Sequence, residues 1–295
     1  MADFNPLVLR RMLALRRFTI VADAELAELA TLAENVIETR LSAGSVIAEA
    51  NRRVPALHLI LNGTIESGDR TWGPQQVFGA LEVLAARELT APAIATTDTL
   101  TLQLFASDVS EFLEDSFDVL RTTMRSLANG VLMRGGAASR YPKHNDRRVL
   151  AESLGLVERL LLFRQQTLFA GVRVEALAAL AHVSDELSWS AGELVTQAGE
   201  LTQSALVIVN GTLEATASAG SVRVLGPGDM IGGLETVAEA RHDTTVQATS
   251  AGRGLRWSST AILDVIEDHA DFGLAMIATF AATLLDGSLG RDGAS

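Results

Sequence analysis

The sequence contains no cysteine, which excludes disulfide bonds, thiolate metal sites and cysteine nucleophiles. It also lacks an excess of positive charge. Its 24 Lys and Arg residues are outnumbered by 36 Asp and Glu residues, leaving a formal net charge of −12. Because nucleic-acid binding needs clustered cations that displace counterions from phosphates, this balance argues against an extended nucleic-acid interface.

Long apolar segments are missing as well. No uninterrupted apolar run reaches the length of about 18 residues that a transmembrane helix needs, so none is expected. A signal peptide is not expected either, because residues 1–6 are polar and arginines interrupt the apolar residues that follow. We therefore expect a cytoplasmic protein. The interrupting arginines are Arg10, Arg11, Arg16 and Arg17.

The patterns of common catalytic and metal sites are also absent. There is no Gly-x-Ser-x-Gly, P-loop or His-Glu-x-x-His pattern, and the five histidines form no His-x-His pair. His58 lies within a predicted strand, where we expect it to be a rim or packing residue. The acidic pairs 114–115 and 267–268 lie on predicted helices, where adjacent side chains point about 100° apart and do not converge on one substrate. We expect neither an enzyme nor a metal site.

What the sequence does contain is an internal repeat. Residues 56–66 (ALHLILNGTIE) match residues 204–214 (SALVIVNGTLE) at a shift of 148. Residues 73–82 (GPQQVFGALE) match residues 226–235 (GPGDMIGGLE) at a shift of 153. The second copy therefore has five extra residues, around 215–223. A register kept over about 110 residues with one loop-sized insertion indicates a duplication.

Each copy is predicted to begin with a helix, continue with short strands broken by glycine, and end with a helix. The expected first helices are 24–34 and 172–182, and the expected closing helices are 108–133 and 259–286. Hydrophobic residues make up 48% of the chain, which suffices for two packed cores. The expected domains are 1–133 and 147–286, joined by a Gly-rich and polar linker at 134–146 and followed by a flexible tail at 287–295.

The first closing helix carries an unusually continuous apolar stripe. Apolar residues recur every three or four positions from Phe112 to Val131. This stripe is wider than one small domain needs. We therefore expect part of it to pack on another surface, either the second domain or a partner chain.

Each copy resembles the cyclic nucleotide-binding domain, a β-roll shared by bacterial catabolite activators, kinase regulatory subunits and gated channels. The resemblance covers about 18–133 and 166–286. It implies a mainly β fold with flanking α-helices, arranged as two tandem double-stranded β-helix domains of jelly-roll type. Three motifs carry it: the Ala-Gly turns at 42–47 and 190–195, the Gly-x-hydrophobic-Glu strands at 59–66 and 207–214, and the phosphate cassettes at 73–81 and 226–234.

The resemblance also implies where a cyclic nucleotide would bind. In the family, a glycine-led helix directs backbone amides at the cyclic phosphate, a glutamate binds the ribose, and an arginine pairs with the phosphate. The corresponding segments give the candidate ligand-binding residues. They are Gly79, Ala80, Leu81 and Leu89 in the first copy, and Gly232, Gly233, Leu234, Arg241, His242 and Asp243 in the second.

Both charged anchors of the family are missing from both copies. The glutamate position holds Ala80 and Gly233, and the arginine position holds Leu89 and His242. Losing the arginine alone removes a charge-assisted pair to the phosphate. Arg87 and Arg241 lie two residues and one residue from the arginine position and could replace it only if the loops shift. We expect no cofactor, and any residual cAMP or cGMP binding should be weak and confined to the second domain.

Two functions of different class remain open. One is an adaptor, in which the two domains dock on a partner protein or form a homo-oligomer. The other is a sensor, in which a cyclic nucleotide moves the closing helices. The missing anchors favour the adaptor, whereas Gly79 and Gly232 favour the sensor only weakly because the turn itself can require glycine. Direct DNA binding is not expected, since about ten residues follow the second closing helix, too few for a helix-turn-helix.

Overall fold

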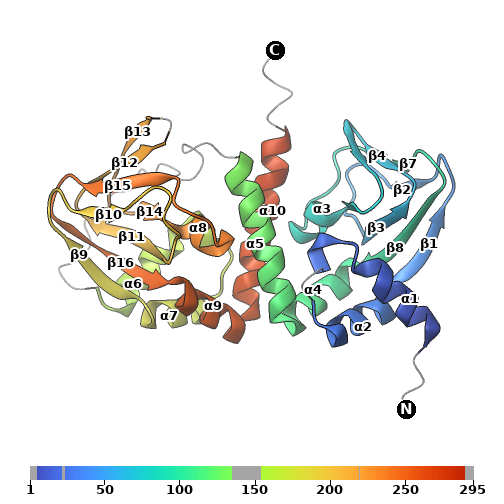
Figure 1. Cartoon of the computed structure of the whole chain (residues 1–295), viewed down its shortest axis with the longest axis horizontal. Coiled ribbons are helices and arrows are strands. Elements are labelled where there is room, and N and C mark those ends of the chain that lie inside the picture. Colours follow the sequence, from blue (N-terminus) through green and yellow to red (C-terminus); the bar gives the residue numbers. More distant parts are fainter. Residues whose placement is uncertain (1–4, 22–23, 135–153, 219, 290–295) are drawn as a thin grey trace. The chain divides into compact units, whose positions relative to one another are not determined.

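The computed structural model describes residues 5–21, 24–134, 154–218 and 220–289 (Figure 1). The first repeat places helices before and after eight strands. Its helices are α1 (Pro6–Leu15), the 3-10 helix η1 (Thr19–Val21), α2 (Leu26–Asn35), α3 (Ala80–Leu84), α4 (Ala106–Asp115) and α5 (Phe117–Arg134). Its strands are β1 (Ile37–Leu41), β2 (Val46–Ala48), β3 (Ala56–Asn62), β4 (Ile65–Ser67), β5 (Arg70–Trp72), β6 (Val77–Phe78), β7 (Ala93–Ala95) and β8 (Thr99–Phe105).

The second repeat has the same element order. Its helices are α6 (Leu156–Arg164), the 3-10 helix η2 (Thr167–Phe169), α7 (Val174–His182), α8 (Gly233–Ala238), α9 (Ser259–Asp268) and α10 (Ala270–Leu289). Its strands are β9 (Asp185–Trp189), β10 (Leu194–Thr196), β11 (Ser204–Asn210), β12 (Leu213–Ala217), β13 (Val222–Leu225), β14 (Met230–Ile231), β15 (Thr244–Ala248) and β16 (Gly252–Ser258).

Each repeat folds its eight strands into two antiparallel four-stranded sheets. The first roll has the strand orders β1-β8-β3-β6 and β2-β7-β4-β5. The second has β9-β16-β11-β14 and β10-β15-β12-β13, which is the same topology. The five extra residues of the second copy lengthen the β12–β13 hairpin relative to β4–β5. The predicted β-rolls and their duplication are therefore confirmed.

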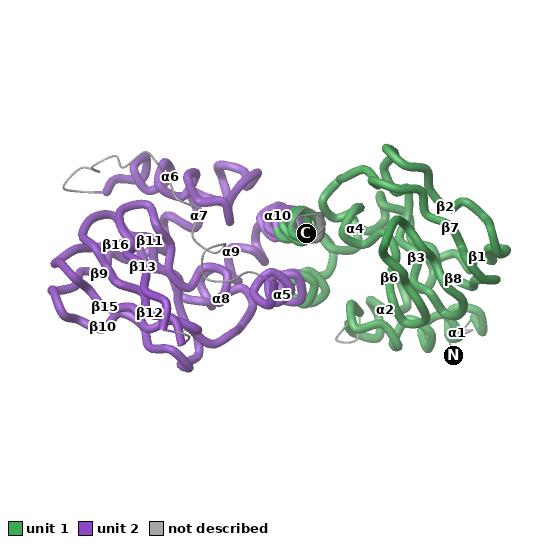
Figure 2. The backbone as a smooth tube through the Cα atoms, turned by 90° about the horizontal axis from the view of Figure 1, so that it is seen from above, with its two compact units in different colours: residues 1–123, 280–295 green, residues 124–279 purple. Residues whose placement is uncertain are grey.

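The chain divides into two compact units. Unit 1 comprises residues 1–123 and 280–295, and unit 2 comprises residues 124–279 (Figure 2). The division falls inside α5 and inside α10, so each roll is grouped with the last part of the other repeat's closing helix. The domain boundaries expected from the sequence follow the repeat rather than compactness, and they stay a prediction. Nearly all of the expected linker and most of the expected tail lie outside the described residues.

The last part of α5 belongs to unit 2. This agrees with the prediction from the apolar stripe that part of the first closing helix packs outside its own domain. Asn129 Nδ2 donates a hydrogen bond to the Ala238 carbonyl at the end of α8 (3.0 Å). Arg125 forms an ion pair with Glu239, the residue that follows Ala238 (3.3 Å). Met124 and Ala128 are fully buried.

The prediction of one continuous closing helix in each repeat was wrong. Ser116 separates α4 from α5 with an extended backbone (φ −124°, ψ 99°). Its hydroxyl accepts a hydrogen bond from the Val119 amide, so it caps the second helix. His269 separates α9 from α10 at the equivalent position. Apolar periodicity continues through both breaks, which is why it did not reveal them.

Each roll encloses its own apolar core. In unit 1, Phe78 and Ile60 are fully buried, with Trp72 packed edge-on against Phe78 at a ring distance of 5.2 Å. In unit 2, Leu213, Leu225 and Val246 occupy the corresponding interior. Strand β3 is buried along five consecutive residues, because one face meets the roll interior and the other meets helices.

His58 is one of the buried residues of β3 and has the packing role expected for it. Its ring lies 6.1 Å from the Phe78 ring, and its Nδ1 is 3.2 Å from the Thr101 hydroxyl. Burial disfavours the charged imidazolium and lowers the pKa of His58 to about 4. His58 is therefore neutral in the folded protein at neutral pH.

Among the residues that the structure describes, one helix is long and apolar enough to cross a membrane by length and composition alone. It is the Ala270–Gly287 part of α10, with a mean hydropathy of 1.3 and 44% of its residues buried within the structure. This is weak evidence, because the core helix of a soluble protein passes the same test.

We expect His58 to make stability depend on pH. Unfolded His58 binds a proton below about pH 6.5, whereas the folded residue does so only near pH 4. The free energy of unfolding should therefore fall by about 3 kcal/mol as pH falls through this window. Urea denaturation at several pH values should show a smaller loss for His58→Gln. The exposed His182→Gln should retain the wild-type slope, and a slope unchanged in His58→Gln would contradict the prediction.

We also expect Gly79 to be required by the fold itself. It has a left-handed backbone (φ +82°), and a Cβ there would lie 2.8 Å from a Val54 methyl. Gly44 is equally left-handed (φ +86°) but faces open space. Gly44→Ala should cost about 1 kcal/mol of backbone strain. Gly79→Ala should cost about 1–3 kcal/mol more through crowding. Equal losses in urea denaturation would show that crowding does not require this glycine.

Candidate functional site

The two cassettes are positioned by buried strands and left-handed glycines. In unit 1, Phe78 anchors β6 in the core, and Gly79 then turns the chain into α3. In unit 2, Ile231 and Gly232 (φ +73°) do the same before α8, and a Cβ on Gly232 would lie 2.7 Å from the Ser204 carbonyl. Steric crowding and backbone conformation thus account for both glycines without a ligand.

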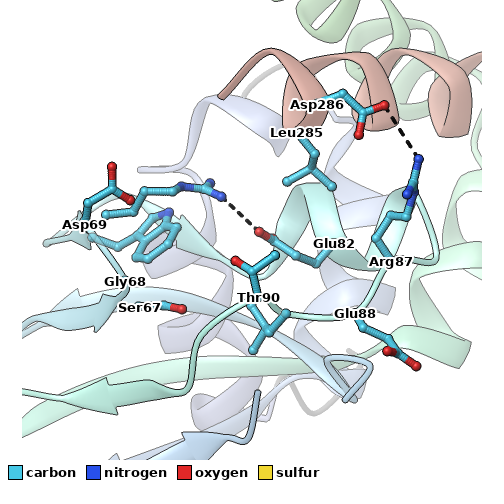
Figure 3. Close-up of a pocket in the computed structure, with 12 residues that line it drawn as sticks. Ser67, Gly68, Asp69, Glu82, Arg87, Glu88, Thr90, Leu285 and Asp286 are labelled. Atoms are coloured by element: carbon cyan, nitrogen blue, oxygen red, sulfur yellow. Dashed lines mark hydrogen bonds and ion pairs between the residues drawn. The ribbon is translucent and has the colours of Figure 1, made fainter. Parts of the chain in front are cut away.

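Unit 1 contains a cleft of about 170 Å³ at its cassette (Figure 3). The β4–β5 hairpin, α3, the segment 87–90 and the last part of α10 form its walls. Four carboxylates and two arginines line it, so its formal charge is negative. These charged residues are Asp69, Arg70, Glu82, Arg87, Glu88 and Asp286.

The best-buried charge of this cleft is Glu82. The Glu82 side chain is only 5% exposed, and its Oε1 accepts a hydrogen bond from Arg70 Nη1 at 3.0 Å. The Arg70 guanidinium also lies over Trp72, with 4.6 Å between its carbon and the ring centroid, a favourable cation–π arrangement. Breaking the pair would leave the Glu82 charge buried without compensation, which is strongly unfavourable.

The second arginine of the cleft is paired more weakly. Arg87 lies 3.6 Å from the Asp286 carboxylate of α10, and Figure 3 shows the two side chains pointing toward each other. Both side chains are more than half exposed. An exposed pair of this kind contributes about 0–1 kcal/mol, so a ligand anion could compete for Arg87.

The remaining cassette residues of unit 1 provide no charge. Leu89, at the family's arginine position, is buried in the roll core, although it also borders the cleft. Ala80, at the glutamate position, and Leu81 are half-buried on α3. An arginine at 89 would therefore have to enter an apolar core rather than replace a surface side chain.

In unit 2, Met230 occupies the space of the family's glutamate. A Cβ on Gly233 would lie 2.1 Å from the Met230 sulfur, so a glutamate fits there only if this side chain moves. Leu234 is half-buried on α8.

The expected cations of unit 2 are also used elsewhere. Arg241 donates to the Gly199 carbonyl (2.8 Å). Burial lowers the pKa of His242 despite the opposing charges of Glu200 and Asp243, so this imidazole is neutral at neutral pH. Asp243 accepts a hydrogen bond from the Ser218 hydroxyl at its carbonyl (3.3 Å).

The sequence analysis missed Arg70 and Glu82. A signal was available, because the repeat aligns Arg70 with Arg223 and Glu82 with Glu235 at the shift of 153. Glu235 is buried like Glu82. Buried acidic residues are rare, so an acidic residue retained in an apolar helical turn of both copies predicts a partner.

Metal chemistry has no support from the part of the chain that the structure describes. Within it, no three His, Asp or Glu side chains are grouped so that they could hold a metal ion. What the unit 1 cleft can do is bind a small molecule against a wall of paired charges and an aromatic ring.

The family model for the "Cyclic nucleotide-binding domain" matches residues 186–269. No curated protein matches the chain. Among solved structures, a cAMP-bound PfPKA-R is 13% identical, with 91% of this chain and 86% of that chain covered and a TM-score of 0.37. The regulatory domain of Toxoplasma gondii PKA with cAMP is 14% identical, with 91% and 98% covered and a TM-score of 0.34.

A third structure is the N-terminal domain of a transcriptional regulator from Streptomyces coelicolor A3(2). It is 20% identical, covers 45% of this chain and 97% of its own, and has a TM-score of 0.40. At these TM-scores the assignment rests on the family match and on the rolls themselves. Residues 186–269 match the family model of the cyclic nucleotide-binding domain, and the identical strand order gives the first repeat the same fold as the second.

Proposed function

We propose that this chain is a non-catalytic regulatory adaptor, a cytoplasmic protein whose two domains dock on a partner protein and bind cyclic nucleotides weakly or not at all. The observation that carries the proposal is the paired charge of the unit 1 cleft. Both of its arginines already contact carboxylates, at 3.0 Å and 3.6 Å. A phosphate entering this cleft meets a net negative wall.

The energetic cost of binding an anion there is large. A phosphate that bound Arg70 would leave the buried Glu82 carboxylate without its cation, at a cost of about 3–5 kcal/mol. Such a cost corresponds to about two to four orders of magnitude in affinity. In unit 2, the neutral His242 and the committed Arg241 offer no replacement.

One observation favours the sensor as the second candidate. Leu285 and Asp286 of α10 border the unit 1 cleft. A nucleotide phosphate that recruited Arg87 would displace Asp286 and so release the end of a closing helix. This version of the function places the ligand in unit 1, rather than in the second domain as the sequence suggested.

Calorimetric titration with cAMP and cGMP tests the adaptor. We expect dissociation constants no tighter than about 1 mM. Asp286→Asn frees Arg87 from its carboxylate and distinguishes the two candidates. Micromolar binding that tightens severalfold in Asp286→Asn and is lost in Arg87→Ala would overturn the adaptor and establish the sensor. Asp108→Asn on α4 is the control for a general change in charge.

Restoring the family's anchors in unit 2 tests whether the cassette backbone remains competent. Gly233→Glu with His242→Arg should give little binding, because Met230 fills the space beside position 233. Adding Met230→Ala should then create measurable cAMP binding by calorimetry. If the double and triple variants bind equally well, Met230 does not close the site. If neither binds, the cassette backbone has lost its amide geometry.

A further inference from the structure

Both repeats expose apolar side chains at equivalent positions of their N-terminal helices. We define the α6 face as Val157 and Leu161 of α6 with Val174 at the start of α7, which are 50–64% exposed. The α1 face consists of the residues 148 positions earlier, which are 47–63% exposed: Leu9, Leu13 and Leu26. In Figure 2, α6 lies at the outer edge of unit 2.

The two faces are structurally equivalent, although the sequence analysis did not extend the repeat to these helices. Arg11 Nη1 donates to the Ala33 carbonyl at 3.0 Å. Arg159 Nη1 donates to the Ala181 carbonyl at 3.1 Å, again 148 positions later. The same buried-side contact therefore fixes the same rotation of α1 on α2 and of α6 on α7.

Exposed apolar positions recur between the two repeats. Single exposed apolar side chains are common and need no explanation. In the described part of the first repeat before α5, however, four of seven large exposed apolar residues have an exposed apolar residue at +148. The four are Leu9, Leu13, Leu26 and Val46, and the other three are Leu7, Ile37 and Phe105. Three of the four pairs belong to the two faces.

The α6 face has opposite charges at its two ends. Helices α6 and α7 are antiparallel, because Arg159 reaches the end of α7 and Arg164 reaches Val172 just before it. Glu158 lies at the N-terminal end of α6, with its carboxylate beside Gly155. Arg164 and Arg173 lie at the other end, and the Arg173 side chain is 72% exposed while it contacts Asp271.

This pattern is self-complementary under a two-fold axis. When two copies of the face meet in antiparallel orientation, each acidic end meets the basic end of the other copy, and the apolar centres meet each other. The α1 face lacks this property. It has Arg10, which contacts Glu38, at one end, and Arg16, Arg17 and Glu25 at the other, so the same pairing would place each Arg10 beside two arginines as well as a glutamate.

We propose that the α6 face binds a second copy of this chain in an isologous, antiparallel contact, which gives the proposed adaptor two copies of its docking surfaces. Apolar contact supplies the association, and the end charges select the partner and its orientation. The proposal concerns a surface remote in sequence from the cassettes. It therefore stands or falls independently of nucleotide binding.

The first test compares equivalent substitutions in the full-length protein. Sedimentation equilibrium over a range of concentrations should show a monomer–dimer equilibrium for the wild type. Leu161→Asp should weaken dimerisation at least about tenfold, while the matched Leu13→Asp on the α1 face should leave it unchanged. A monomeric wild type, or equal effects of the two substitutions, would overturn the proposal.

The second test uses the two-fold geometry itself. Glu158→Arg places arginine at both ends of the face, and the double variant Arg164→Glu with Arg173→Glu places glutamate at both ends, so each variant alone should be monomeric. An equimolar mixture of the two variants should form heterodimers, because every end contact is then Arg with Glu. If circular dichroism shows both variants folded and the mixture stays monomeric, the proposed orientation is wrong.

A third measurement addresses the other occupants of an apolar face. Sedimentation with vesicles of phosphatidylcholine and phosphatidylserine should leave the wild-type protein in the supernatant, since its net charge of −12 opposes an anionic surface. Vesicle binding that is lost in Leu161→Asp would assign the face to a membrane and overturn the proposal.

Discussion

A buried carboxylate, Glu82, constrains the cleft of unit 1 more than any other group there. An ionised side chain with 5% exposure needs a cation at hydrogen-bond distance, and Arg70 from β5 provides it. Trp72 then holds the guanidinium through its ring face. The pair joins the β4–β5 hairpin to α3 and neutralises Arg70. An anion that recruited Arg70 would therefore have to break this internal pair.

The cassette glycines are required by the backbone conformation and packing of the rolls, not by the Arg70–Glu82 pair. Left-handed backbone at Gly79 and Gly232, with a Val54 methyl and the Ser204 carbonyl close by, leaves no room for a side chain. A protein of this fold that stops binding nucleotides can lose its arginine and glutamate at little cost to stability. It cannot lose these glycines so cheaply. Their presence therefore says that the roll is intact and says nothing about a ligand.

The sequence predicted the features that repeat and missed those that depend on tertiary contacts. Duplication, roll topology and the long β12–β13 hairpin followed from one shift of 148 and another of 153, because register is a direct property of sequence. The breaks at Ser116 and His269 depend on single backbone conformations within an unbroken apolar period. Helices α1 and α6 were not predicted. In the structure Arg11 and Arg159 donate hydrogen bonds to the carbonyls of the buried residues Ala33 and Ala181, contacts that depend on the tertiary fold.

For the site, the sequence predicted only which charged residues of the family are missing. Ala80, Leu89, Gly233 and His242 showed which charges were lost. The charges of the unit 1 cleft were missed, although the repeat aligns Arg70 and Glu82 with identical residues of the second copy. Arg70 lies outside the cassette, and its link to Glu82 exists only because the β4–β5 hairpin folds beside α3. Likewise, α10 reaches the unit 1 cleft from nearly 200 residues further along the chain.

The duplication itself offers a way to separate structural from functional residues within one chain. Positions that stay buried and apolar in both copies, such as Leu29 and Leu177, are explained by packing. Positions that stay apolar while exposed in both copies are not, because solvent does not select for leucine or valine. At Leu13 and Leu161 the apolar character is shared, whereas the surrounding charges have diverged: Arg10 corresponds to Glu158, and Glu25 to Arg173. Divergent charges around a shared apolar contact are what two related surfaces need in order to choose different partners.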